Sequence, residues 1–213
     1  MTSIHPSTPP TSFQNLLSHL KSFPPPLLPP GKAQDPSLSD SIASLYLHPA
    51  IESLLHILNH DLPSAHFLVR HMQSPPAYEG MYIHGILHRV EGDMDNARAW
   101  YSDVSGSEGF TKFWGEPDEG LEKEDGDGRK LPRQKSAREF LDAVEGRIGG
   151  KQEAPKALEQ RSRAELDSLM EWCEKKFGTE MWKDASKVWV QPSEEISQMG
   201  EDQVSGSAGP RNF

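Results

Sequence analysis

The sequence predicts an all-α protein with a single folded domain. Apolar residues recur every three or four positions through most of residues 41–190, and this spacing places them on one face of a helix. No stretch alternates apolar and polar residues for long enough to indicate a β-strand. Residues 1–40 and 191–213 are instead rich in Pro, Ser, Thr or Gly, so we expect a helical domain over 41–190 with a disordered region at each end.

Proline dominates the N-terminal region. The run FPPPLLPPG at 23–31 favours an extended polyproline conformation, which is typical of a spacer and is also found in ligands of aromatic grooves. Within the same region, SFQNLLSHLKSF at 12–23 has helical spacing, and Ser12 is a suitable N-cap. This pattern allows one short helix that docks on the folded body.

Residues 41–104 are predicted to form a series of short helices. Apolar residues have helical spacing in five segments, 41–47, 49–59, 63–72, 77–92 and 95–104. Pro49 and Pro63 stand in the expected first turns of two helices, where a missing N–H costs no hydrogen bond. The sequences QSPPAY and EGDM separate helices from one another.

The stretch 105–135 is Gly-rich and largely acidic, and we expect it to be a flexible insertion. Phe110, Phe113 and Trp114 are its obvious apolar anchors. Its EKEDGDG sequence lacks the ligand spacing of an EF-hand calcium loop, so a solvated loop is the preferred interpretation.

Helices are predicted again over 136–148, 156–178 and 179–190. Ser136 and Glu139 have the spacing of a capping box, and Gly178 suits a helix C-terminus. Cys173, the single cysteine, lies on the apolar stripe of the second of these helices. We therefore expect a buried, unreactive thiol.

Charge and composition exclude several classes of function. The net charge of −10, without a basic patch, argues against binding to nucleic acid or to an anionic membrane surface. One cysteine allows no intrachain disulfide, and the N-terminus lacks the pattern of a secretory signal. No apolar run has the ~20 residues of a spanning helix. A cytoplasmic protein is expected.

Two segments of the chain are similar at an offset of 32 residues, 51–72 and 83–104. The identical pairs are Ile51/Ile83, Leu55/Leu87, His56/His88, Asp61/Asp93 and Ala65/Ala97. Ser53 aligns with Gly85, so each first helix has a small residue where a second helix could approach, with the alanine fitting beneath it. This pattern resembles the tetratricopeptide repeat over two units, although the usual first-helix Trp and closing Pro are missing. The resemblance implies antiparallel helical hairpins followed by additional C-terminal helices.

A second resemblance rests on three motifs, Ala-His, then His-Gly-Ile-x-His-Arg-x-Glu-Gly-Asp, then Asn-Ala-x-x-Trp. The motif positions are His66, His84, His88, Arg89, Glu91, Asp93, Asn96 and Trp100. Together with EWCEKKFGTEMWKDAS, they resemble a group of small uncharacterised fungal and bacterial proteins. The resemblance implies a domain unit and supplies no mechanism.

Six of the nine histidines lie between residues 56 and 88. His84 and His88 are four residues apart and share a helix face, so they are candidate ligands of one divalent metal ion, with Glu52, Glu79 or Glu91 as a possible carboxylate. The repeat predicts that His56 and His88 are equivalent and that His66 lies close by. The alternative is that these rings are hydrogen-bonded core residues.

Two functions follow as hypotheses. The first is a protein-interaction or adaptor domain that holds a protein or peptide partner on its helical repeats. The second is a small metal-binding protein or acid–base enzyme whose site lies among the histidines. The candidate binding residues are His56, His66, His84, His88, Arg89 and Trp100, with His84 and His88 as the candidate metal ligands.

Overall fold

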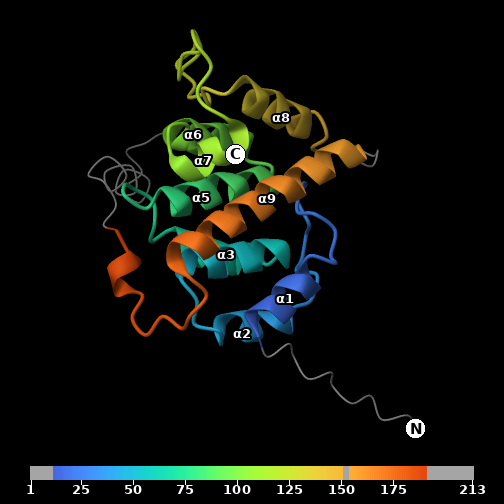
Figure 1. The fold of residues 1–213 in the computed structure, drawn as a ribbon. Helices are drawn as coiled ribbons and strands as arrows, with labels where there is room; N and C mark the ends of the chain where they lie inside the picture. The colour runs from blue at the N-terminus through green and yellow to red at the C-terminus, as the bar shows by residue number, and fades with distance from the viewer. Residues whose placement is uncertain (1–11, 151–153, 191–213) are drawn as a thin grey trace, which may run out of the picture.

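The computed structural model describes residues 12–150 and 154–190. In these residues the chain is all-α, as predicted, and its only β-type pairing is one isolated bridge between Glu124 and Lys130. The helices are α1 Phe13–Leu20, α2 Leu38–Ala43, α3 Pro49–Leu58, α4 Leu62–Val69, α5 Tyr78–Glu91, α6 Met94–Val104, α7 Glu108–Trp114, α8 Lys135–Glu145 and α9 Lys156–Phe177 (Figure 1). A single 3-10 turn follows at Ser186–Val188. The predicted tail at 191–213 lies outside the described residues.

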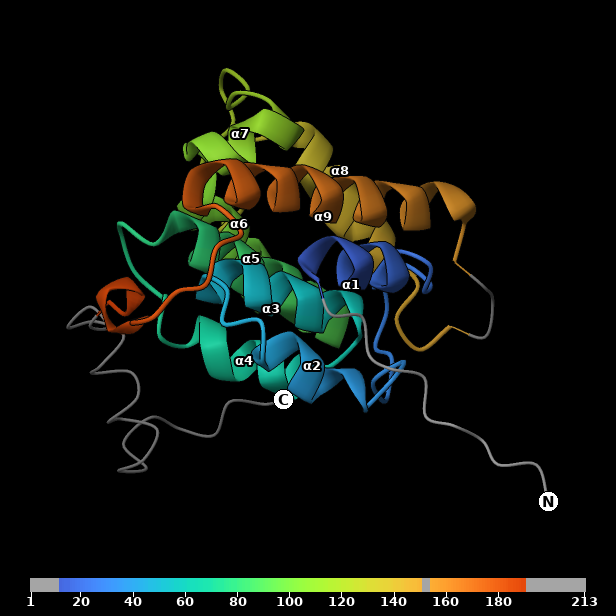
Figure 2. The same ribbon diagram turned by 60° about the horizontal axis from the view of Figure 1, so that its bottom comes forward.

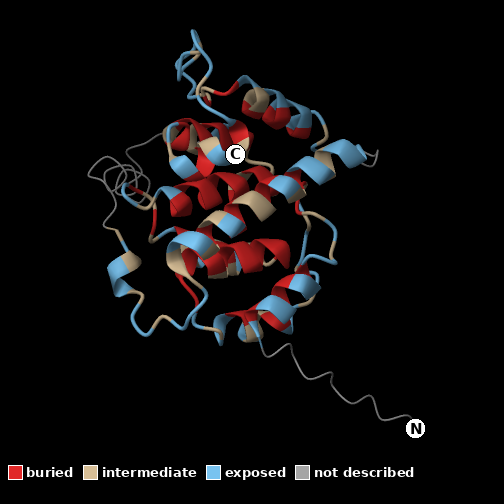
Figure 3. Ribbon diagram, viewed as in Figure 1, coloured by how far each residue is buried: buried red, intermediate tan, exposed pale blue. Residues whose placement is uncertain are grey.

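Two pairs of consecutive helices, α3 with α4 and α5 with α6, form the centre of the fold. Helix α4 also packs on α5, which joins the two pairs, and the long helix α9 lies across α3 and α7 (Figures 1 and 2). The faces that meet in the centre are buried, whereas the outer faces of α1, α8 and α9 are exposed (Figure 3). Helix α5, which carries His84 and His88, is therefore held within the body of the molecule, whereas α4, which carries His66, buries only Ala65 and Val69.

The turns inside the two helix pairs have the same construction. His60 and Gly92 occupy equivalent places and both have left-handed backbone, with φ values of 57° and 86°. The next residues, Asp61 and Asp93, cap the second helix of each pair by accepting a hydrogen bond from the backbone N–H of Ser64 and Asn96. Identical short-range chemistry thus reverses the chain twice, 32 positions apart.

Close packing within the second pair depends on Gly85. A Cβ placed there would lie 2.8 Å from Cδ1 of Tyr101 and 3.0 Å from Cβ of Trp100. The side chains nearest to such a Cβ are those of Trp100 and Tyr101, and Ala97, one turn before Tyr101 on α6, is fully buried. That Ala97 fits beneath Gly85 stays a prediction.

The prediction of a disordered region over 1–40 is wrong for residues 12–40, which pack on the body. Helix α1 begins after Ser12, which caps it as predicted, and buries Leu16 and Leu20 completely. The proline run is anchored as well, because Ser162 on α9 donates a hydrogen bond of 2.6 Å to the carbonyl of Pro26. The leucines between the prolines bury apolar surface, which an average over the Pro-rich composition does not show.

Part of the predicted flexible insertion 105–135 is core. Helix α7 lies within it and buries Phe110 and Trp114 on the rest of the molecule. The capping box at Ser136 is also wrong, because α8 begins one residue earlier and Gln134 is its N-cap. The helix expected over 179–190 is reduced to the short 3-10 turn, whereas Gly178 ends α9 as predicted.

Candidate metal centre

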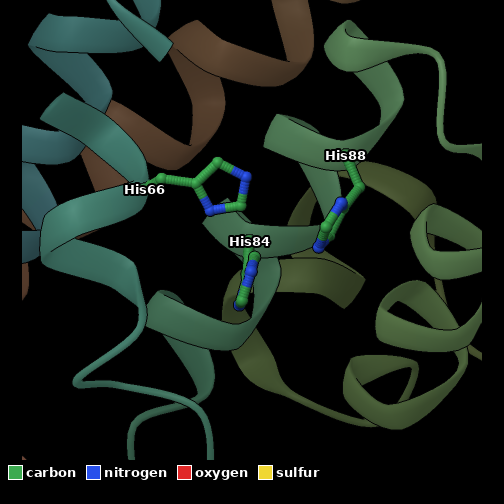
Figure 4. A group of neighbouring side chains, drawn as sticks. All are labelled: His66, His84 and His88. Atoms are coloured by element: carbon green, nitrogen blue, oxygen red, sulfur yellow. The ribbon is translucent and has the colours of Figure 1, made fainter. Parts of the chain in front are cut away.

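Three histidines from two helices converge between α4 and α5. His84 and His88 lie four residues apart on α5 and project from the same face, and His66 extends toward them from α4 (Figure 4). One nitrogen of each ring can be chosen so that all three lie within 4.8 Å of one another. The packing of α4 on α5 therefore joins His66 to the pair that the sequence marked as candidate ligands.

The rings of this cluster, which we call the His66/84/88 cluster, are in direct contact. The centroids of His84 and His88 are 4.7 Å apart with nearly parallel planes, and His66 meets both edge-on at 5.4 and 5.3 Å. Trp100 on α6 stacks on the opposite face of His84 at 4.6 Å. These contacts restrict the orientation of the His84 ring.

Two ring nitrogens in the cluster are buried without a hydrogen-bond partner among the described residues, Nδ1 of His84 and Nδ1 of His88. A buried polar atom without a partner costs about 1–3 kcal/mol, so such atoms are rare in folded proteins. The nearest carboxylate oxygens to Nδ1 of His88 belong to Glu91 at 3.4 Å and Asp93 at 3.6 Å, too far or too poorly directed for a hydrogen bond. The cluster therefore has unused lone pairs or N–H groups in its interior.

Glu91, at the end of α5, is the carboxylate of the cluster. One of its oxygens lies 2.9 Å from Nε2 of His66. Burial opposes ionisation of this carboxyl, but the hydrogen bond from His66 and the interaction with the nearby His88 ring outweigh it and lower the pKa of Glu91 to about 2. The group is ionised near neutral pH and orients the His66 ring.

His84 lies in the most buried part of the cluster. Burial, followed by the like charges of His88 and His66, lowers the pKa of His84 to about 3. Its imidazole is therefore neutral near pH 7, and only a neutral imidazole has the free lone pair that a metal ion requires.

His56, which the repeat places as the counterpart of His88, does not belong to this cluster. Its Nδ1 lies 3.1 Å from Asp61, and its Nε2 lies 4.0 Å from Glu52. Asp61 is the N-cap of α4, so His56 bonds within the turn of its own helix pair. The predicted site of four histidines is therefore reduced to three.

Arg89 also lies apart from the cluster. It is fully buried, and its Nη2 donates to Glu165 of α9 over 2.9 Å. Glu165 accepts three further hydrogen bonds, from Tyr82, Tyr101 and Trp114. The guanidinium nitrogens of Arg89 all have hydrogen-bond partners, and its ion pair with Glu165 is fully buried. Arg89 is therefore a core residue.

Two cavities border the cluster, and His66 lines both. The first, of about 490 Å³, also includes Lys32, Asp61 and Glu91 in its lining. The second, of about 460 Å³, is lined by Pro63, His66, Phe67, Arg70, Gln73 and His84. The sequence interpretation did not include Arg70, although its position four residues after His66 puts both on one helix face.

The single cysteine is buried, as the sequence predicts. Cys173 is fully buried on α9, and burial raises the pKa of its thiol well above the ordinary value. It is a core residue and not a nucleophile.

The chain was compared with protein-family models, with curated protein sequences and with solved structures, and none of the three comparisons found a match. The two resemblances drawn from the sequence therefore stay predictions. Among the described residues, none of the helices has both the length and the apolar character needed to cross a membrane. What bears on function is the geometry of the His66/84/88 cluster.

Proposed function

We propose that this protein binds a divalent transition metal ion, zinc in the first place, through His66, His84 and His88. The observation that carries the proposal is the convergence of three imidazoles whose candidate ligand nitrogens lie within 4.8 Å of one another. Imidazole is a preferred ligand of zinc, and catalytic zinc sites commonly combine three protein ligands with one open position. Glu91 then contacts Nε2 of His66 and orients its ring without touching the ion, as carboxylates do in many zinc sites.

The cluster needs only a small adjustment to receive the ion. Bonds of 2.0–2.1 Å in a tetrahedron place ligand nitrogens about 3.3 Å apart, so the three nitrogens must move inward by an ångström or so. Rotation of the His66 side chain, which is 35% exposed, can supply much of this movement, whereas His88 is 15% exposed. The Nδ1 atoms of His84 and His88 have no hydrogen-bond partner among the described residues, so a metal bond to either atom would replace a missing hydrogen bond.

The test is metal analysis of protein purified without a histidine tag. We expect one equivalent of zinc per chain after dialysis against excess zinc and removal of the unbound ion. His84→Phe keeps a ring for stacking on Trp100 but has no nitrogen, and His88→Ala removes a second ligand. Each variant is expected to lose stoichiometric zinc while its circular dichroism spectrum stays helical.

His56→Asn is the matched control. It removes a buried histidine from the equivalent turn of the first helix pair, and the Asn amide can still bond to Asp61. Stoichiometric zinc should persist in this variant. Equal zinc content in the wild type, His84→Phe and His88→Ala would contradict the proposal, as would a wild-type protein that takes up no metal.

The other functional hypotheses stay predictions. An interaction domain on tetratricopeptide-like repeats is supported by the two similar helix turns and by the exposed Phe67 on α4, whose side chain is available to a protein or peptide partner. An acid–base enzyme is supported by the contact of His66 with Glu91. The cytoplasmic location rests on the sequence alone.

A further inference from the structure

The two cavities that His66 lines differ in charge. The first has the carboxylates of Asp61 and Glu91 in its lining, opposite Lys32. Among the described residues, the second has no carboxylate in its lining and has one permanent cation, Arg70. In a chain of net charge −10, this is a local surface that can accept an anion.

The guanidinium of Arg70 contacts an aromatic ring and has no ion-pair partner among the described residues. Its Cζ lies 4.4 Å from the centroid of the Phe67 ring, a cation–π contact that limits where the guanidinium lies. No carboxylate within residues 12–150 and 154–190 forms an ion pair with it. Stacked arginines of this kind bind planar carboxylates through two parallel hydrogen bonds.

His66, His84 and Arg70 face the same cavity. Arg70 follows His66 by four residues, so the two side chains are neighbours on the surface of α4 and its C-terminal end. Gln73 adds an amide to the wall, and Pro63 and Phe67 supply an apolar side. Because His66 and His84 belong both to the cluster and to the wall of this cavity, whereas Glu91 lines the other cavity, an ion held by the cluster would border a cavity that contains Arg70 and no carboxylate.

From these relationships we infer that the cavity is the ligand site of the metal centre and binds a small carboxylate. One carboxylate oxygen occupies the open position on the metal, Arg70 pairs with the carboxylate, and the short apolar part of the ligand packs on Pro63 and Phe67. The inference rests on the proposed metal-binding function. To that function it adds the class of ligand, a small carboxylate, and a binding residue, Arg70, that is not one of the metal ligands.

The experiment uses the full chain loaded with Co²⁺, whose visible absorption reports a change of ligand in its coordination sphere. Metal content is measured first. Acetate is then titrated, and we expect a saturable spectral change. Arg70→Gln should retain the metal and bind acetate about tenfold more weakly, because a charge-assisted pair is lost. Arg70→Lys should recover part of the affinity, since it restores the charge without the planar fork.

Lys32→Gln is the matched control, because Lys32 is an exposed cation that lines the other cavity beside His66. Its acetate affinity should equal that of the wild type. Loaded protein that shows no acetate-dependent change, or equal affinity in Arg70→Gln and wild type, overturns the carboxylate site and leaves the metal-binding function standing. A protein that takes up no metal overturns both.

Discussion

Arg89 and Glu165 form an ion pair in which neither side chain has any exposure to solvent, with 2.9 Å between Nη2 and Oε2. The pair joins α5 to α9 across 76 positions of sequence. Arg89 also donates to Ser162, which in turn bonds to the carbonyl of Pro26 in the proline run. One connected set of hydrogen bonds therefore fastens the second helix pair, the long helix and the N-terminal segment to each other.

Removal of Arg89 should be strongly destabilising. Arg89→Met leaves Glu165 as a buried carboxylate without its cation, and the loss of one partner of a buried pair costs about 3–5 kcal/mol. Arg98→Met is the control, because its partners Asp142 and Glu145 have side chains 65% and 51% exposed and stay hydrated. The control should lose about 1 kcal/mol or less. Urea unfolding of both variants measures the difference, and equal losses would contradict it.

Zinc should stabilise the folded protein by mass action. An ion that binds the folded chain at 100 times its dissociation constant adds about 2.7 kcal/mol to the free energy of unfolding. We expect a concentration-dependent rise in the midpoint of thermal unfolding for the wild type and for His56→Asn, and none for His88→Ala. A similar rise in all three proteins would indicate zinc binding elsewhere on the chain.

Substitution of Gly85 tests the close approach of α5 and α6. A methyl group there meets the ring of Tyr101, whose hydroxyl is held by Glu165 over 2.6 Å and so resists displacement. Gly85→Ala should cost about 1–3 kcal/mol through overpacking. Gly106→Ala has no atom within 4 Å of the new Cβ and should leave the stability within about 0.5 kcal/mol of wild type. Chemical denaturation checks both, and a neutral Gly85→Ala would refute the tight contact.

Glu52 should make stability fall with rising pH. Burial raises the pKa of Glu52 from 4.5 to about 7, so between these values the folded state holds a proton that the unfolded state has lost. At about 1.4 kcal/mol per pH unit, the loss across this window is on the order of 3 kcal/mol, and it is complete above pH 7.

Glu52→Gln removes this ionisation, while all other titrating groups, including the neighbouring His56, are retained. Its stability relative to wild type should therefore rise as pH increases from about 4.5 to 7 and then stay level. Urea unfolding at several pH values measures this difference. A difference that does not vary with pH would show that Glu52 ionises normally.

The N-terminal helix should contribute to global stability. Leu16 is fully buried on α1, and Leu16→Ala is expected to cost about 2–5 kcal/mol. Gln14→Ala on the exposed side of the same helix should be close to neutral. Both variants are measured by denaturant unfolding. A small effect of Leu16→Ala would mean that α1 is dispensable for the fold.

Local features of the fold were predictable because they depend on residues a few positions apart. The all-α class follows from apolar spacing, and Ser12, Pro49, Pro63 and Gly178 stand at helix ends as their chemistry requires. The sequence predictions are wrong where a segment is buried against parts of the chain that lie far away in the sequence. Helix α7 forms inside an acidic, Gly-rich stretch because Phe110 and Trp114 are buried against other helices.

The candidate site divides in the same way. The sequence alone determined that His84 and His88 share one face of a helix, because residues four apart on any α-helix do so. Only the tertiary structure decided that His66 joins them, that His56 turns to Asp61, and that Arg89 pairs with Glu165. Those choices depend on which helices pack together, and packing is decided by the burial of apolar surface over the whole chain, which no local pattern contains.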